Sequence, residues 1–236
     1  MAKKPSKRPE SLEIIYANKR WNLLHQLRKN ARQIMEPLEK SNLEPIVHGS
    51  IARGDISPKS DIDIFIPTQA SSFTIQSALE KVNITPTRLY VVQATPNYAM
   101  KAHIEIDEST TVSFPLMKLR KVEREFYKFG GEINLKDLQK NLRVAGVDKR
   151  LMLIEPTEEG HVESTIMGRE EHVAHVLDVC VETVLDRVHA LLRRDDVGRT
   201  GVFMKQELPE GQTFEMLLEE LAKKNPAVRR RLTSQL

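Results

Sequence analysis

Apolar residues in the first half of the chain follow two spacings, one typical of helices and one typical of strands. After a polar start, a spacing of three and four residues predicts a long helix, capped by Ser11 and extending to about residue 38. Apolar and alternating runs predict strands at residues 45–48, 61–66, 87–94, 100–107 and 110–114. Short helices are expected between these strands, at residues 51–53 and 73–82.

The second half of the chain is less regular, and its pattern changes near Gly130 and Gly131. Helices are expected at residues 117–128, 134–143, 170–193 and 213–224, and strands at residues 150–155, 161–167 and 202–208. The stretch 134–167 fits a winged-helix-like module and equally well a simple α+β cap. These elements predict an α/β (α+β) fold class in which helices flank a mixed sheet.

The predicted elements divide the chain into three parts. We expect a disordered basic tail at residues 1–9, because this segment is polar and contains two prolines. A larger domain is expected at residues 10–120, followed by a smaller α+β domain at residues 121–236.

Charge and cysteine content narrow the class of protein. The chain has 36 Lys and Arg residues and 33 Asp and Glu residues, so its formal net charge is +3. Basic clusters lie near both ends and suit contact with phosphate groups: Lys3, Lys4, Lys7 and Arg8, then Arg229, Arg230 and Arg231. Cys180 is the single cysteine, which excludes a disulfide within the chain. No apolar run approaches the roughly 20 residues of a membrane helix, so we expect a cytoplasmic protein with no membrane partner.

Candidate chemistry begins at Gly49 and Ser50, where a short apolar strand ends. A glycine lets the backbone approach a ligand closely, and a serine adds a hydroxyl beside the free N–H groups of a following helical turn. This combination predicts an anion site suited to a nucleoside triphosphate. Arg53 lies one helical turn after Ser50, so we expect it to assist as a phosphate clamp.

Asp61 and Asp63 are two residues apart in an otherwise apolar predicted strand. Alternation along a strand places both carboxylates on one face, with the isoleucines between and after them on the other. Two carboxylates this close repel each other unless cations intervene, and hard oxygen ligands favour Mg²⁺ or Mn²⁺. The pair therefore predicts a metal site.

The order of these motifs resembles a known family. A Gly-Ser pair, ten further residues and an Asp-x-Asp strand are similar to the DNA polymerase β-type nucleotidyltransferase superfamily. The longer layout, with Phe114-Pro115 and then Lys118-Leu119, most resembles archaeal CCA-adding enzymes and poly(A) polymerase-like domains. The resemblance covers roughly residues 10–120 and implies a nucleotidyltransferase domain there.

That family normally supplies a third carboxylate from a neighbouring strand, as a metal ligand or general base. The expected strand at residues 110–114 has no acidic residue. Glu105 and Asp107 precede it, across a predicted hairpin turn at Glu108 and Ser109, and alternation places both on one polar face. Either residue can complete the site, or both can be surface carboxylates beside the turn.

The resemblance implies transfer of a nucleoside monophosphate from a nucleoside triphosphate such as ATP to a hydroxyl group, with release of pyrophosphate. Asp61 and Asp63 would then hold Mg²⁺, and Gly49 and Ser50 the β- and γ-phosphates. RNA is the favoured acceptor, because the predicted helix at 117–128 interleaves basic and aromatic residues. Small molecules and protein side chains remain alternative acceptors. The other alternative is a non-catalytic RNA- or nucleotide-binding protein on a degenerate fold. A toxin–antitoxin transferase has weaker support, because such domains are usually shorter.

Overall fold

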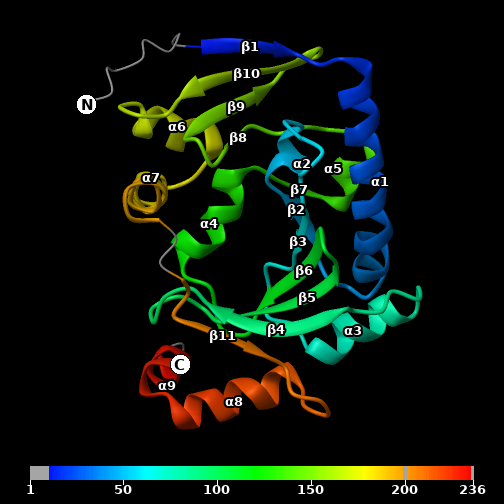
Figure 1. The fold of residues 1–236 in the computed structure, drawn as a ribbon, viewed down its shortest axis with the longest axis vertical. Helices are drawn as coiled ribbons and strands as arrows, with labels where there is room; N and C mark the ends of the chain where they lie inside the picture. The colour runs from blue at the N-terminus through cyan, green and yellow to red at the C-terminus, as the bar shows by residue number, and fades with distance from the viewer. Residues whose placement is uncertain (1–10, 199–200, 235–236) are drawn as a thin grey trace.

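The protein is described by a computed structural model that covers residues 11–198 and 201–234. The described chain forms two sheets, of seven and four strands, with helices packed against both (Figure 1). This mixed α+β architecture confirms the predicted fold class. The expected basic tail at residues 1–9 lies outside the described residues.

The seven-stranded sheet carries the motifs singled out above. Its strand order is β11 (Met204–Glu207), β4 (Arg88–Gln93), β5 (Lys101–Asp107), β6 (Thr110–Pro115), β3 (Ile62–Phe65), β2 (Ile46–His48) and β7 (Glu132–Asn134). β3 and β6 run parallel, whereas the other neighbouring strands are antiparallel. β7 and β11 follow residue 120 in the sequence, so the sheet extends across the expected boundary between two domains.

One face of this sheet forms the main hydrophobic core. Alternation on the central strands directs Ile62, Ile64 and Val112 to this face, where each is at most 1% exposed. The helices that contribute to this core are α1 (Asn18–Lys40), α2 (Ser50–Arg53), α3 (Ser72–Glu80), α5 (Leu135–Gln139), α8 (Phe214–Lys224) and α9 (Pro226–Thr233). Phe214 of α8 packs edge-to-face on Phe114 of β6, with ring centroids 5.6 Å apart. The opposite face is therefore the one left for chemistry.

That opposite face, called the open face below, is covered at one end by α4 (Lys121–Gly130). Tyr127 of α4 stacks on Phe65 of β3 with ring centroids 3.7 Å apart, and Ile46 completes this small cluster. Lys101 of β5 donates a hydrogen bond to the Tyr127 hydroxyl at 2.8 Å. The cover leaves Asp63 accessible to solvent.

The second sheet consists of β1 (Ser11–Ile15), β10 (Gly160–Thr165), β9 (Met152–Pro156) and β8 (Gly146–Val147), in that order. Residues of α6 (Glu170–Leu177) and α7 (Val181–Val197) pack with it around a second apolar core. The last described helix, α9 (Pro226–Thr233), follows α8 and packs against it. No described helix is long and apolar enough to cross a lipid bilayer.

Two local predictions were wrong. Ser11 does not cap a helix, because Ser11–Ile15 pairs in antiparallel register with β10, and α1 begins only at Asn18. The single helix expected at residues 170–193 is two helices, since Asp178 adopts a left-handed conformation with φ of 50°. The helix expected at residues 213–224 is confirmed as α8, and α9 then begins at Pro226, whose missing N–H is tolerated in a first turn.

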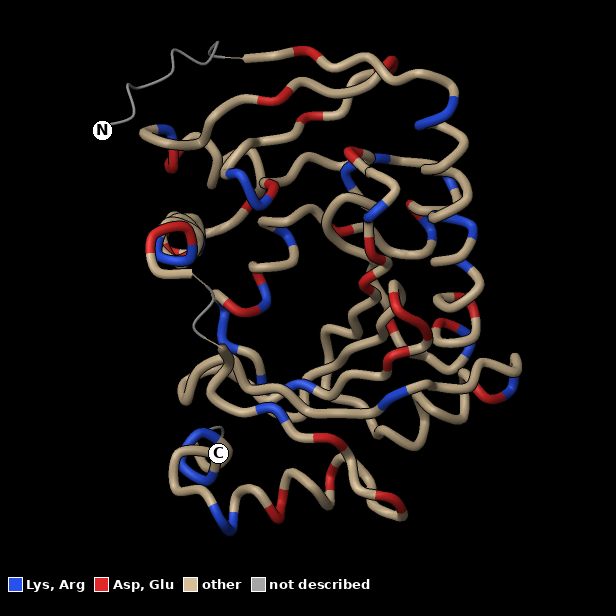
Figure 2. The backbone as a smooth tube through the Cα atoms, in the orientation of Figure 1, with Lys and Arg blue, Asp and Glu red and all other residues tan. Residues whose placement is uncertain are grey.

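Charge is spread over the molecule. Figure 2 shows Lys and Arg interspersed with Asp and Glu along the seven-stranded sheet and most helices, whereas the strands of the four-stranded sheet carry only acidic charges. The net charge of the whole chain is small, at +3. The overall electrostatic field of the protein therefore does not identify a binding face, and a site has to be identified from local geometry.

Candidate active site

The turn between β2 and α2 has the geometry that the Gly-Ser pair predicts. Gly49 has φ of +76°, a left-handed conformation that glycine adopts without steric penalty. Its N–H donates to the carbonyl oxygen of Gly131 at 2.9 Å, which fixes the turn against the segment leading into β7. A Cβ atom at Gly49 would meet nothing within 4 Å, so the space beside this backbone is open to a ligand.

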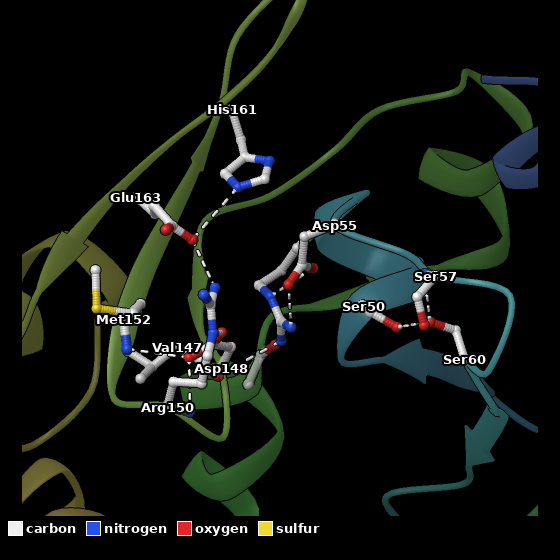
Figure 3. A network of polar contacts seen from close by, with 12 residues as sticks. Ser50, Asp55, Ser57, Ser60, Val147, Asp148, Arg150, Met152, His161 and Glu163 are labelled. Carbon is white, nitrogen blue, oxygen red and sulfur yellow. Dashed lines mark hydrogen bonds and ion pairs between the residues drawn. The ribbon is translucent and has the colours of Figure 1, made fainter. Parts of the chain in front are cut away.

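Ser50 and the loop after α2 form a small hydroxyl network, drawn on the right of Figure 3. The Ser50 hydroxyl lies 3.2 Å from the hydroxyl oxygen of Ser60, which also accepts a hydrogen bond from the Ser57 N–H at 2.9 Å. The network links the end of the Gly-Ser turn to the residue directly before Asp61. It therefore connects the Gly49-Ser50 turn to the start of the strand that carries Asp63.

Asp61 and Asp63 lie as alternation predicts. Asp63 belongs to β3, Asp61 directly precedes it, and both are exposed, while Ile62 and Ile64 are buried on the opposite face. β3 pairs with β2, whose end carries the Gly49 turn. The structure thus places Asp61 and Asp63 at the start of the strand next to the Gly49-Ser50 turn.

The surroundings of Asp63 disfavour its charged form. Although solvent reaches the carboxylate, the protein packed around it removes enough hydration to raise its pKa, and the charge of Lys149 acts in the opposite direction. A carboxylate with a raised pKa gains more from a bound cation than a fully hydrated one does. Asp63 is therefore suited to act together with positive charge.

We expect Asp63→Asn to raise the free energy of unfolding of the metal-free protein near neutral pH. The pKa of Asp63 is higher in the folded than in the unfolded protein, so the free energy of unfolding falls as the pH rises between these two values. Asn has no proton to lose, so the variant avoids this fall. Urea unfolding in the presence of a chelator, at acidic and neutral pH, measures the difference between variant and wild type. A difference that does not grow with pH would contradict the explanation.

The strand next to Asp63 does not supply a third carboxylate. β6, the strand beside β3, aligns Thr111 with Asp63 and carries no acidic residue. Glu105 of β5 is the next residue in the same row, opposite Thr111. It shares the open face with Asp63 at two strand spacings, roughly 10 Å between Cα atoms.

Asp107 does not follow Glu105 in the regular alternation of β5, because the strand register shifts between the two residues. Its carboxylate accepts hydrogen bonds from the Ser109 N–H at 2.8 Å and the Ser109 hydroxyl at 2.9 Å. Partial burial raises the pKa of Asp107, but the hydrogen bonds from Ser109 and Thr110 outweigh it, so the pKa is lowered. Asp107 thus holds the hairpin turn, whereas Glu105 lies in the same row of the open face as Asp63.

Arg53, expected to assist as a phosphate clamp, has protein groups as its partners in the structure. It is 5% exposed, and its guanidinium donates two hydrogen bonds to the Asp55 carboxylate, at 3.0 and 2.9 Å. A third bond runs to the carbonyl oxygen of Gly130. These partners occupy the donors that a phosphate would need, and through them Arg53 joins α2 to the segment before β7.

Lys149 is a basic residue near the site that the sequence motifs do not indicate. It lies exposed in the turn between β8 and β9, and its charge acts on both Asp63 and His48. Asp148 fixes this turn by accepting from the N–H groups of Arg150 and Met152 at 2.8 and 3.1 Å (Figure 3). The second sheet thereby contributes a positive charge, from a position remote in sequence.

The donors present suit a hard divalent cation. Within residues 11–198 and 201–234, no group of three or more His, Cys, Asp or Glu side chains is arranged to hold a metal ion. Mg²⁺, however, is commonly held by one or two carboxylates together with substrate phosphates and water. Asp61 and Asp63 fit that mode, in which the nucleotide supplies the remaining ligands.

The Gly-Ser turn and the Asp-x-Asp strand lie side by side in the sheet, which is the arrangement expected of a nucleotidyltransferase. In agreement, a family model described as a nucleotidyltransferase domain matches residues 28–169. The chain belongs to this family, within the polymerase β-type superfamily, and its general activity is nucleotidyl transfer. Comparisons with curated proteins and with solved structures gave no match.

Proposed function

We propose that the protein transfers a nucleoside monophosphate from a nucleoside triphosphate to a hydroxyl group of an acceptor, with Mg²⁺ or Mn²⁺ as cofactor. The observation that carries this proposal is the placement of Asp61 and Asp63 on the strand next to the Gly49-Ser50 turn. The open backbone at Gly49 supports a role in holding the β- and γ-phosphates.

The reaction forms a bond between the acceptor oxygen and the α-phosphorus, and it breaks the bond from that phosphorus to the bridging oxygen of pyrophosphate. Gly49 and Ser50 hold the leaving pyrophosphate, and Lys149 adds positive charge beside it. Asp61 and Asp63 would hold Mg²⁺, which when bound would neutralise charge at the phosphates and favour deprotonation of the attacking hydroxyl. Glu105, directly or through a water molecule, accepts the proton of that hydroxyl.

A second candidate function is nucleotide or RNA binding without catalysis. It is favoured by one observation: Thr111, and not an acidic residue, stands beside Asp63 on the neighbouring strand. Glu105 would then be too far from the phosphates to assist. The two functions predict the same nucleotide-binding turn but different fates of the nucleotide.

A transfer assay separates the two functions. The protein is incubated with Mg²⁺ or Mn²⁺, total RNA, and ATP labelled with radioactive phosphorus at either the α or the γ position. We expect label on RNA from the α-labelled nucleotide alone, because the β- and γ-phosphates leave as pyrophosphate. RNA that is retained by the protein but carries no label from any of the four nucleoside triphosphates would identify the binding function instead.

Replacing Glu105 and Asp107 one at a time tests the assignment of the third carboxylate. We expect Glu105→Gln to lower the transfer rate about 100-fold, the size typical of general base catalysis, with little change in nucleotide affinity. Asp107→Asn should leave the rate within about twofold, because Asp107 serves the turn; its expected effect is a loss of about 1 kcal/mol in unfolding free energy. The reverse ranking of the two transfer rates would contradict the assignment.

A further inference from the structure

The open face of the sheet continues beyond Glu105 into a surface formed by β5, β4 and β11. His103 and Tyr90 are paired across β5 and β4, and their rings are stacked, with centroids 5.0 Å apart and planes 2° from parallel. The ammonium group of Lys205, on β11, lies 4.4 Å from the centroid of the Tyr90 ring. We call Tyr90, His103 and Lys205 the stacking surface.

The stacking surface is accessible and only partly neutralised. Tyr90 and His103 are half-buried and Lys205 is exposed. Nearby, Arg88 donates to the Glu207 carboxylate at 2.7 Å, which leaves that pair without net charge. Lys205 has no ion pair with a carboxylate in the part of the chain that the structure describes, so its charge is available to an anion.

The two stacked rings are uncharged groups next to that charge. Burial, followed by the charges of Lys101 and Lys205, lowers the pKa of His103 to about 4, so its ring is uncharged near neutral pH. Burial, followed by the charge of Glu105 and, more weakly, that of Asp63, raises the pKa of Tyr90. The carboxylates of the active site thus lie within electrostatic range of the Tyr90 hydroxyl.

The in-line geometry of the proposed transfer favours an acceptor on the side of Asp63 where β6, β5 and β4 lie. In phosphoryl transfer the attacking and leaving oxygens lie roughly in line through the phosphorus. The turn proposed to hold the leaving pyrophosphate is at the end of β2, on one side of β3. The attacking hydroxyl must then approach from the other side, over β6 and β5, where Glu105 and the stacking surface lie.

We propose that the stacking surface binds the 3′ end of a single-stranded polynucleotide, which is the acceptor of the transferred nucleotide. This inference rests on the proposed function, because it assigns the acceptor class for that reaction. A nucleobase stacks on the ring pair formed by Tyr90 and His103, and a backbone phosphate contacts Lys205. The terminal hydroxyl then extends along the open face toward Glu105 and Asp63.

The chemistry of the surface favours a polynucleotide over other hydroxyl acceptors. Two parallel rings with a cation beside them offer stacking and phosphate contact together, which a base and its phosphate can use at once. An aminoglycoside is polycationic and would be repelled by Lys205. A protein side chain carries a single hydroxyl and has no planar group to use the Tyr90–His103 pair.

Binding of a fluorescent single-stranded oligonucleotide, followed by anisotropy without nucleotide, tests the stacking surface directly. We expect Tyr90→Leu to weaken binding about tenfold, since one stacked base is lost. Tyr90→Phe keeps the ring and should bind like the wild type. Lys205→Glu should weaken binding and reduce the slope of log affinity against log salt by at least about 0.7, the value for one phosphate contact on a single strand.

Lys223→Glu is the matched charge control. Lys223 is exposed on α8, the helix that packs on the opposite face of the sheet, and its replacement changes the net charge equally. Each variant is checked by thermal unfolding and by Mg²⁺-dependent ATP binding, both of which should match the wild type. An RNA and a DNA oligonucleotide of the same sequence show which sugar the surface prefers, and binding of either supports the proposal.

The outcomes separate this inference from the function on which it rests. Equal binding by the wild type, Tyr90→Leu and Lys205→Glu would overturn the stacking surface. So would a wild type that transfers a nucleoside monophosphate to a small molecule and binds no oligonucleotide. If Tyr90→Leu loses oligonucleotide affinity but the wild type transfers nothing, the polynucleotide surface stands and the transferase function fails.

Discussion

Asp61→Ala combined with Asp63→Ala is expected to reduce nucleotidyl transfer by at least about a thousandfold. Charge stabilisation by a divalent ion is worth several kcal/mol in the transition state, and a loss of about 4 kcal/mol corresponds to this factor. The double variant should also lose the Mg²⁺-dependent part of ATP binding. Transfer is measured with α-labelled ATP, and binding by calorimetry with and without Mg²⁺.

The single variants and a control sharpen this result. Each single replacement should already remove most of the activity, because Asp61 and Asp63 act as one cation site and their effects are not additive. Asp137→Ala, in α5, is a control that removes one carboxylate elsewhere without touching the open face. A double variant that transfers nucleotide at the wild-type rate would end the proposed function.

Arg53→Ala is expected to lower the free energy of unfolding by about 3–5 kcal/mol, the range for breaking a buried ion pair from one side. The side chains of Arg53 and Asp55 are 7% and 10% exposed, so Asp55 would be left buried without its partner. The carbonyl oxygen of Gly130 would also lose its donor. Urea denaturation at constant pH measures the change.

An exposed pair provides the comparison for Arg53. Arg32 and Glu36 are 3.6 Å apart on α1, with side chains 43% and 40% exposed, and Arg32→Ala should change stability by less than about 0.5 kcal/mol. If Arg53→Ala were as stable as the wild type but bound ATP more weakly, Arg53 would be a phosphate ligand after all. If it loses stability and affinity together, its role is to hold α2 in place.

Features that depend on neighbouring residues could be predicted from the sequence. The Gly49 turn and the β3 strand are such features, because a glycine conformation and an alternation of buried and exposed positions are encoded within a few residues. The same is true of the helix that begins after Thr213, whose side chain accepts from the Met216 N–H. The aspartate pair could therefore be placed on one face of a strand.

Features that depend on remote residues could not be predicted. Ser11 lies in a strand only because Ser164 lies opposite it, and nothing near Ser11 indicates that partner. The sequence near Arg53 indicates a phosphate ligand, because its partners Gly130 and Val147 are remote in sequence and meet it only in the fold. Lys149 approaches Asp63 through the second sheet, and no motif spacing connects the two residues.

The two outer strands of the large sheet, β7 and β11, have a consequence for the order in which the protein matures. The Gly49 turn is tied to Gly131, and the stacking surface needs Lys205, so both are incomplete while only the first 120 residues have been synthesised. Pairing over such sequence distances closes late, because the entropy of long loops must be overcome first. A growing chain would thus carry its aspartates early and acquire a working site only near the end of its synthesis.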